Sequence, residues 1–386
     1  MKRYDITFVL PIIQVGFPPG GYDIVYRLAS SIKRKNLECA IIFPVDLYKY
    51  IPDYVRNNNN KMIYLAYKAF TGIFYAKRFN YIFKYWEFIN KLFLKTDYFF
   101  NMLRNVDSYI YGKVEEVKFK TKLMIATGWE TAYFVKEYIK INMDTTPLYF
   151  IQNSEDAPSF TKLNSQKAKE TYALDFKKIV INKKLLNRFK DDKPEFMHIG
   201  VNTDFYHVIN PLNKRECIIF PLRKNESKGA IFALECIKKL LSIKINRKIV
   251  AFGDYLPDEL PEYVKNKIIY YYHPSNETLL KIYNDGEIFV LPSLVEGMPS
   301  PPLEAMSCGC AVIVTDNGGV NEYIEDQING LMCPIKNSNC LFEKILYLIN
   351  NEKIKDEIIT NALETAKKFT YQKMAEQFFN IIEKYL

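Results

Sequence analysis

Two glutamates eight residues apart, Glu296 and Glu304, occupy the stretch of the chain best suited to chemistry. The stretch follows an apolar run that reads as a strand, and it passes through a polar loop with Gly297 into a segment predicted to be helical from Pro301. Ser300, just before that proline, is a typical helix cap. Free N–H groups at a helix N-terminus attract phosphate, so this loop and helix predict a diphosphate site.

The two glutamates suit different parts of a nucleotide-linked ligand. A carboxylate in the first turn of the helix accepts hydrogen bonds from both hydroxyls of a ribose, which predicts that Glu304 binds ribose. Glu296 lies on the loop and would face the hydroxyls of a sugar. Each glutamate also has a plain alternative explanation. Glu304 would be an ordinary helix residue whose charge interacts favourably with the helix dipole, and Glu296 would be a solvated loop residue. Because the prolines of this loop lack an N–H, its backbone donors are Gly297, Met298, Ser300 and Leu303.

A second cluster is the basic loop between the apolar run that ends at Leu222 and the helical pattern that begins at Ala230. Its Arg223 offers a planar fork to phosphate oxygens, and its Lys228 offers a point charge. The plain alternative is a solvated basic loop. A glycine pair near the N-terminus, Gly20–Gly21, would either let the backbone approach a ligand closely or form an ordinary turn.

Glu296 and Glu304, together with the loop and helix that carry them, resemble the Glu-x7-Glu signature of glycosyltransferase family 4, which consists of retaining enzymes with the GT-B fold. Weaker similarity covers the rest of the C-terminal half and the first thirty residues or so, whereas residues 50–120 match nothing recognisable. Beyond the two glutamates, the resemblance runs through Cys308-Gly309-Cys310-Ala311-Val312-Ile313, Asn317-Gly318-Gly319, Glu322-Tyr323 and Asn329-Gly330-Leu331.

The family resemblance implies a mechanism as well as a fold. It implies that Arg223 and Lys228 grip the diphosphate of a sugar donor and that the Gly20–Gly21 loop lies close to that donor. The leaving phosphate itself would take the proton of the acceptor on the same face, which retains the anomeric configuration. Arg223, Lys228 and the loop amides would stabilise the growing charge, so they and Glu296 are the predicted catalytic residues. No metal or other cofactor is expected, because no Asp-x-Asp follows a predicted strand.

Three residues of the N-terminal half are candidate contacts of the sugar or the acceptor, namely Trp129, Glu130 and Gln152. Many relatives place a His of this half against the 6-hydroxyl of the donor, but this chain has no His before His198. An indole face suits a methyl group better than a hydroxyl. Because the segments around these residues resemble rhamnosyltransferases, we expect a 6-deoxy donor such as dTDP-rhamnose. Glu130 or Gln152 could instead replace the His and bind a 6-hydroxyl.

The elements that position these residues predict an α/β protein. A strand at Ile6–Ile13, the glycine loop, a helix at Ile24–Lys35 and a strand at Cys39–Phe43 are typical of the start of a parallel α/β domain. A second series begins near residue 209. Further buried strands are predicted at Leu123–Ala126, Leu148–Ile151, Ile218–Leu222, Lys248–Phe252, Ile269–Tyr272, Ile288–Leu291 and Ala311–Thr315.

The predicted architecture is two Rossmann-like domains that face each other across a cleft. Residues 1–208 would form the acceptor-side domain, and residues 209–370 the domain that binds the nucleotide sugar. Residues 371–386 have the pattern of an amphipathic helix, and the resemblance implies that this helix crosses back onto the N-terminal domain. Ligands of such sheets bind at the carboxyl ends of the strands.

Charge and composition indicate the surroundings of the protein. Residues 1–205 carry 32 Lys and Arg against 21 Asp and Glu, within a chain whose net charge is +9. This asymmetry indicates either an anionic partner, such as a membrane or a lipid phosphate, or a solvated lysine-rich surface. The basic, aromatic segment 62–103 would lie on an anionic membrane or form core. Seven Cys without a Cys-x-x-Cys pair favour buried thiols in the cytoplasm, and no apolar run is long enough to span a membrane.

Taken together, the sequence predicts a cytoplasmic glycosyltransferase, peripheral to the inner face of the membrane. Its donor would be a nucleotide-diphosphate sugar, its acceptor a glycan or a lipid-linked glycan, and its product a surface polysaccharide or glycoconjugate. Nucleic acid is not an expected partner. Two alternatives stay open: a sugar-nucleotide epimerase or phosphorylase of similar shape, and a protein that binds a sugar nucleotide without chemistry.

Overall fold

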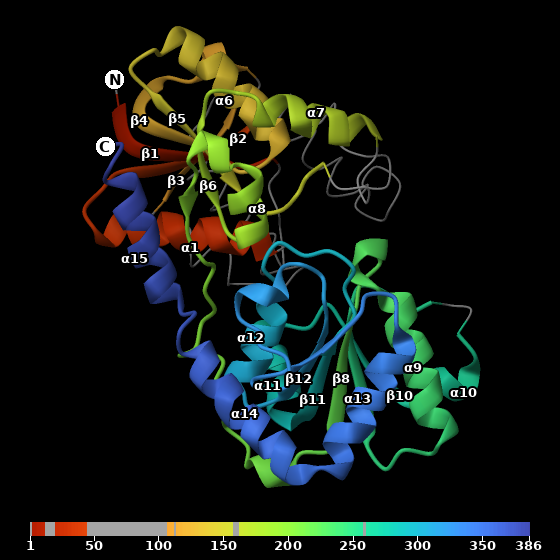
Figure 1. The fold of residues 1–386 in the computed structure, drawn as a ribbon. Helices are drawn as coiled ribbons and strands as arrows, with labels where there is room; N and C mark the ends of the chain where they lie inside the picture. The colour runs from red at the N-terminus through yellow and green to blue at the C-terminus, as the bar shows by residue number, and fades with distance from the viewer. Residues whose placement is uncertain (1, 12–19, 45–105, 112, 157–161, 258–259) are drawn as a thin grey trace, which may run out of the picture. The chain divides into compact units, whose positions relative to one another are not determined.

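The computed structural model describes residues 2–11, 20–44, 106–111, 113–156, 162–257 and 260–386. The basic, aromatic segment 62–103 therefore lies outside the described residues. The chain divides into two compact units (Figure 1). The first unit comprises residues 1–180, 185–197 and 377–386, and the second comprises residues 181–184 and 198–376.

The first unit is built on a parallel sheet whose strands are ordered β3-β2-β1-β4-β5-β6-β7. Its central pair is β1 with β4, in a register that sets Thr7 beside Met124. β2 is buried along its whole length, as expected where helices cover both faces of a parallel sheet. The strands are β1 Lys2–Val9, β2 Cys39–Pro44, β3 Asp107–Tyr111, β4 Phe119–Ala126, β5 Thr146–Ile151, β6 Lys177–Val180 and β7 Glu195–Phe196.

The helices of this unit connect its strands. Their apolar faces pack on the sheet, as in α1, where Ile24, Val25, Leu28 and Ile32 are buried. The described helices are α1 Gly20–Arg34, α6 Trp129–Ile141, α7 Lys162–Tyr172 and α8 Lys183–Arg188, with the short 3-10 helices η2 Val114–Glu116 and η3 Lys190–Asp192.

The second unit has a parallel sheet with the strand order β10-β9-β8-β11-β12-β13. The helices α9 and α13 pack together, as do α12 and α14 (Figure 1). The strands are β8 Cys217–Leu222, β9 Lys248–Gly253, β10 Ile268–Tyr272, β11 Gly286–Leu291, β12 Ala311–Thr315 and β13 Leu331–Cys333. The helices are α9 Ala230–Ser242, α10 Glu262–Lys265, α11 Asn276–Asp285, α12 Ser300–Ser307, α13 Ser338–Asn350 and α14 Glu352–Ala366, with η4 Leu212–Lys214, η5 Glu226–Lys228 and η6 Val320–Glu322.

The last helix, α15 Tyr371–Ile382, has buried apolar residues on one side, as its amphipathic pattern predicts. The ring of Phe378 stacks on Phe8 of β1, with centroids 5.8 Å apart. The ammonium of Lys35 lies 5.5 Å from the centroid of the Phe379 ring. The end of α15 is thereby packed in the first unit, together with the strand that begins the chain.

The structure corrects parts of the element prediction. β10 is not a buried strand: it lies at the edge of its sheet, where Ile269 and Tyr272 are exposed. The short strands β3, β6, β7 and β13 were not predicted, because two to five residues carry too little pattern to separate from a loop. α1 begins at Gly20, inside the predicted glycine loop.

Candidate active site

The candidate site of the second unit is made by three loops at the carboxyl ends of β8, β11 and β12, which are neighbours in the sheet. Backbone hydrogen bonds join the loops to one another. The N–H of Leu294 donates to the carbonyl of Ser227 at 2.7 Å, and the N–H of Glu296 donates to the carbonyl of Asn317 at 3.1 Å. The basic loop and the glutamate loop, 68 residues apart in sequence at Lys228 and Glu296, therefore form one surface.

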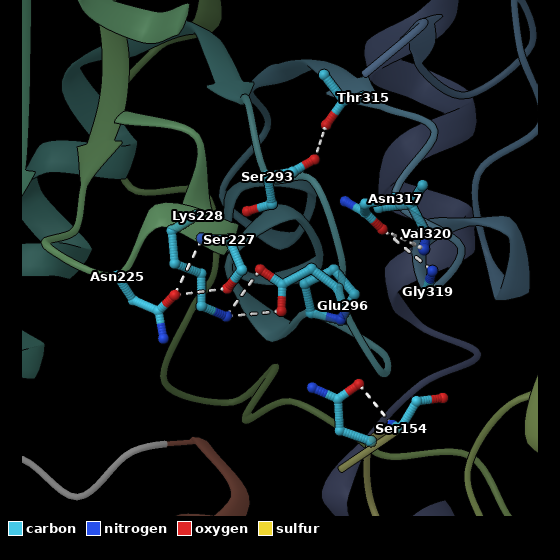
Figure 2. A network of polar contacts seen from close by, with 12 residues as sticks. Ser154, Asn225, Ser227, Lys228, Ser293, Glu296, Thr315, Asn317, Gly319 and Val320 are labelled. Carbon is cyan, nitrogen blue, oxygen red and sulfur yellow. Dashed lines mark hydrogen bonds and ion pairs between the residues drawn. The ribbon is translucent and has the colours of Figure 1, made fainter. Parts of the chain in front are cut away.

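Lys228 and Glu296 form an ion pair at the centre of this surface (Figure 2). The Nζ atom of Lys228 lies 2.9 Å from Oε1 and 2.7 Å from Oε2 of Glu296, so the ammonium contacts both carboxylate oxygens. The lysine side chain is 37% exposed and the glutamate side chain 10% exposed. The pair thus keeps a cation partly open to solvent, where a phosphate could reach it, while its counter-ion is mostly buried.

The local fold of the basic loop points Lys228 toward Glu296. Asn225 caps the short helix η5: its Oδ1 accepts from the N–H of Ser227 at 2.9 Å and from the hydroxyl of the same serine at 2.8 Å (Figure 2). Lys228 is the last residue of η5. The capping hydrogen bonds fix the turn that carries the lysine.

Gly229 lets the basic loop lie against the glutamate loop. Its φ is +67°, a conformation that side chains disfavour, and a Cβ added there would lie 2.0 Å from the carbonyl oxygen of Pro292. At the third loop, a Cβ on Gly319 would lie 2.6 Å from the carbonyl oxygen of Gly297. Both approaches are backbone against backbone, which only glycine permits.

The third loop is held by its own side chains. Oδ1 of Asn317 accepts from the N–H groups of Gly319 and Val320, at 3.1 and 3.2 Å (Figure 2). The hydroxyl of Thr315 donates to the carbonyl of Ser293 on the glutamate loop. Asn317 and Thr315 therefore stabilise the conformation of the third loop.

The helix that follows Glu296 differs in detail from the prediction. α12 begins at Ser300, and its cap is Pro299, not Ser300; no side chain caps the first turn. The hydroxyl of Tyr323 donates to the carbonyl of Pro299 at 2.7 Å and holds this start in place. Glu304 is the fifth residue of α12, so it lies in the second turn rather than the first.

The environment of Glu304 contains a buried tyrosine that the sequence did not single out. The hydroxyl of Tyr283 on α11 donates to Oε2 of Glu304 at 3.0 Å. Among the predicted backbone donors, Gly297 and Met298 are buried and Ser300 is half-buried. Leu303 is fully buried, so its side chain belongs to the core.

Arg223 begins the basic loop and lies near Tyr270 of β10 and near His273, which follows β10. The next residue, Lys224, donates its N–H to Oδ1 of Asp254 at 2.9 Å. Burial lowers the pKa of His273; Asp254 opposes this effect and the guanidinium of Arg223 adds to it. Of the two predicted phosphate cations, Lys228 thus contacts the loop after β11, whereas Arg223 lies near His273.

In the first unit, the structure brings two predicted site residues together. The amide Nε2 of Gln152, after β5, donates to the carbonyl of Gly21 at 3.2 Å. Gly20 begins α1, and a Cβ on it would meet nothing within 4 Å. The side chain of Gln152 thus fixes the glycine loop, while its Oε1 is buried and has no hydrogen-bond partner in the part of the chain that the structure describes.

Trp129 and Glu130 begin α6, after β4. The indole is only 3% exposed, contacts the ring of Tyr133 edge-on, and has the ammonium of Lys167 5.6 Å from its centroid. Little of its surface is left for a ligand. Glu130 lies beside a second glutamate, Glu155, and a Cβ on Gly128 would be 3.2 Å from one carboxyl and 3.3 Å from the other.

Comparison with known proteins identifies the second unit. Residues 202–365 match the family model described as glycosyl transferases group 1. These residues form a group 1 glycosyltransferase domain. The chain thus contains a glycosyltransferase domain, and the three loops described above belong to the matched region.

The chain has relatives that are named glycosyltransferases. It is 23% identical over 94% of its chain to the N,N'-diacetylbacillosaminyl-diphospho-undecaprenol alpha-1,3-N-acetylgalactosaminyltransferase of Campylobacter jejuni, of which the match covers 95%. It is 25% identical to the uncharacterized glycosyltransferase MJ1607 of Methanocaldococcus jannaschii over half of its chain, a match that spans only 54% of that protein.

A solved structure shares the fold of the whole chain. Anabaena Alr3699/HepE, in complex with UDP and glucose, superposes with a TM-score of 0.70 at 14% identity and covers 99% of this chain and 100% of its own. The fold is therefore α/β with two Rossmann-like domains, each on a parallel sheet, as the sequence predicted.

Glu130 at the start of α6 and Glu155 after β5 form an acid pair in the first unit. Burial, and next the charge of Glu130, raises the pKa of Glu155 to about 8. Burial likewise raises the pKa of Glu130 to about 7. The hydroxyl of Tyr149 donates to Oε2 of Glu155 at 2.6 Å. Glu130 therefore differs from an ordinary solvated carboxylate at the start of a helix.

We expect this pair to make stability depend on pH. A carboxyl whose pKa is raised in the folded state contributes stability below its unfolded pKa, and this contribution is lost as the pH rises toward 8. Glu155→Gln, which mimics the protonated group, should therefore match the wild type near pH 5 and exceed it by about 2 kcal/mol at pH 8. Urea unfolding at both pH values measures this difference.

The control for the acid pair is Glu137→Gln, on the exposed side of α6, where the carboxylate pairs with Lys140. Its effect should be small and nearly equal at both pH values. A Glu155→Gln effect that does not change between pH 5 and pH 8 would contradict a raised pKa.

Two further findings bear on cofactors and membranes. Among the described residues, no three His, Cys, Asp or Glu side chains gather where they could hold a metal ion. No described helix is both long and apolar enough to cross a membrane. The seven cysteines are free thiols, six of them buried.

The sequence did not single out four residues that shape these sites. Asn225 and Asn317 orient loops, Tyr283 contacts Glu304, and Glu155 completes the acid pair. Asn225 had a detectable signal, because an Asn two residues before a Ser in a strand-to-helix loop is typical of a cap. Asn317 likewise acts locally, on N–H groups two and three residues further along the chain. Tyr283 and Glu155 act on residues distant in sequence, so spacing alone does not reveal them.

Proposed function

We propose that this glycosyltransferase moves a sugar from a nucleotide-diphosphate donor to a glycan or lipid-linked acceptor, with retention of configuration, in the synthesis of a surface polysaccharide or glycoconjugate. The observation that carries the proposal is the Lys228–Glu296 pair, which lies where three tied loops meet at the carboxyl ends of neighbouring strands. Ligands of open α/β sheets bind at such ends.

The proposed roles follow from the chemistry of each group. Lys228 and Arg223 bind the diphosphate and stabilise the charge that develops on it as the sugar leaves. The N–H of Ser300 at the start of α12 adds a donor, while the buried Gly297 and Met298 shape the loop. Glu296, held by Lys228, is placed to accept hydrogen bonds from sugar hydroxyls once the ammonium turns to phosphate.

Retention in this proposal needs no protein nucleophile. The phosphate oxygen that leaves the sugar takes the proton of the acceptor hydroxyl, while the new glycosidic bond forms on the same face. No metal or other cofactor takes part in the proposed reaction, since the cationic side chains serve the diphosphate. An anomer-specific NMR analysis of the product would test this part of the proposal.

The acceptor is proposed from the relatives and from charge. The Campylobacter relative is named for a sugar linked through diphosphate to undecaprenol. A lipid diphosphate is anionic, and the first half of this chain carries the excess of Lys and Arg. We therefore propose a lipid-linked or glycan acceptor and a peripheral position at the cytoplasmic face of the membrane.

We propose a 6-deoxy sugar donor, with dTDP-rhamnose as the first compound to test. The support is the absence of any His before His198, together with Gln152 at the end of β5. The nearly buried indole of Trp129 gives this idea less support than its sequence position did. A thymidine donor would also offer Glu304 one ribose hydroxyl instead of two. The name of the Campylobacter relative favours a second candidate, a UDP-N-acetylhexosamine.

The test is a donor panel: dTDP-rhamnose, UDP-N-acetylgalactosamine, UDP-glucose and UDP-galactose, each with a polyprenyl-diphosphate-linked glycan. We expect turnover with the 6-deoxy donor to exceed that with the hydroxylated hexoses, though an apolar pocket rejects a hydroxyl by only about a hundredfold. Preference for a donor with a 6-hydroxyl would refute the 6-deoxy proposal and leave glycosyl transfer standing.

The same donor panel also tests the two alternative functions that the sequence left open. An epimerase would change the sugar without an acceptor, and a phosphorylase would need inorganic phosphate and release a sugar phosphate. A protein that only binds would show thermal stabilisation by a donor and no turnover. Binding without turnover for every donor and acceptor in the panel would exclude the proposed reaction for these substrates.

A further inference from the structure

A buried tyrosine stands behind the carboxylate that we propose for ribose binding. Tyr283 of α11 is wholly buried, and its hydroxyl donates to Oε2 of Glu304 at 3.0 Å. Burial, and next the charge of Glu304, raises the pKa of Tyr283 well above its usual value, so the hydroxyl stays protonated. A neutral phenol beside a carboxylate acts as the donor of the hydrogen bond.

The ring of Tyr283 has little freedom to move. Three aromatic rings meet it edge-on: Tyr206 at 5.8 Å, Phe252 of β9 at 6.1 Å and Phe289 of β11 at 5.8 Å between centroids. Edge-to-face contacts of this kind favour one orientation of a ring. The hydroxyl is therefore a rigid donor, fixed by two strands of the sheet.

Glu304, by contrast, has a flexible side chain on a short helix. It lies in the second turn of α12, with its residue half-buried. A carboxylate binds the two adjacent hydroxyls of a ribose well only if it is held at the right angle before the ligand arrives, because ordering a long side chain on binding costs affinity. The hydrogen bond from a rigid phenol supplies that ordering in advance.

We propose that Tyr283 is a positioning residue, which fixes the Glu304 carboxylate for the ribose hydroxyls of the nucleotide. The inference rests on the proposed function, in which Glu304 binds ribose. It adds a specificity element: the preference of the site for a nucleotide with ribose hydroxyls depends on a residue that does not touch the nucleotide.

The experiment compares ligands that differ only at the ribose. Isothermal titration calorimetry would measure the affinity of the whole chain for UDP, GDP, ADP, CDP and dTDP and for the matching 2′,3′-dideoxynucleoside diphosphates. For the nucleotide that binds, Tyr283→Phe should lower the ratio of ribose to dideoxyribose affinity about tenfold, since about 1.4 kcal/mol of hydrogen-bonding energy corresponds to a factor of ten. The affinity for the dideoxy ligand should stay within about twofold.

Two further variants separate positioning from a general structural effect. In a Glu304→Gln background, Tyr283→Phe should change the ratio no further, because the carboxylate it positions is gone. Tyr138→Phe is the matched control: this wholly buried tyrosine of α6 donates to the carbonyl of Phe119 at 3.1 Å, so the variant loses a similar buried hydrogen bond elsewhere. Its ratio should equal that of the wild type.

The outcomes are distinct. Equal losses for the ribose and dideoxy ligands in Tyr283→Phe, or no loss at all, would overturn the positioning role while leaving nucleotide binding intact. A wild type that does not distinguish ribose from dideoxyribose would overturn the role of Glu304 and this inference with it. A wild type that binds none of the nucleotides would overturn the proposed function itself.

Discussion

Lys228→Ala should lower kcat/KM for the sugar donor by about ten- to a hundredfold, because a hydrogen bond to a charged group contributes about 1.5–3 kcal/mol. The variant loses a partly exposed cation and leaves the mostly buried carboxylate of Glu296 without its ion pair. Arg223→Ala should lower kcat/KM by a similar factor, because it removes only an interaction with the diphosphate. Steady-state kinetics with the donor identified by the panel would measure both.

The binding of fragments shows whether the lost interaction involves phosphate. A free nucleoside has no phosphate, so it should bind both variants as well as the wild type, whereas the nucleoside diphosphate should bind more weakly. The matched control is Lys224→Ala, which removes the same charge from an exposed residue of the same loop. If nucleoside and diphosphate lose affinity equally, the assignment of Lys228 and Arg223 to phosphate is wrong.

Gly229→Ala should strongly destabilise the second unit. The φ of +67° costs an L-residue of order 1 kcal/mol, and the added Cβ would lie 2.0 Å from the carbonyl oxygen of Pro292. The clash is with backbone, so no side chain can move aside, and the two loops that carry Lys228 and Glu296 must separate. We expect a loss of about 3 kcal/mol or more in the free energy of unfolding, the range of substitutions at specially constrained backbone positions.

The control for this substitution is Gly20→Ala at the start of α1, where a Cβ meets nothing within 4 Å. Alanine is favoured over glycine inside a helix, so the control should leave stability unchanged or slightly higher. Urea unfolding of both variants measures the effect, and the ligand-free protein suffices. A Gly229→Ala protein as stable as the wild type would show that the loops do not approach as the structure has them.

The sequence determined the α/β class of this protein because its apolar runs are spaced by helical patterns and ended by turn residues. The strands around Cys39–Pro44 and Ala311–Thr315 were predicted within one residue, since wholly buried parallel strands are continuous apolar runs. The edge strand β10 was misjudged as buried, because its tyrosines look apolar in sequence and only the strand order shows that one side has no neighbour.

The candidate site divides in the same way. The sequence was enough to predict which residues form the candidate site, because a motif fixes the identity and spacing of residues close together along the chain. These residues are Arg223, Lys228, Glu296 and Glu304. That Lys228 contacts both oxygens of Glu296, and Tyr283 one oxygen of Glu304, was decided only by the tertiary structure. Parallel strands bring their carboxyl ends together across crossovers of many residues, and no local pattern encodes which side chains then meet.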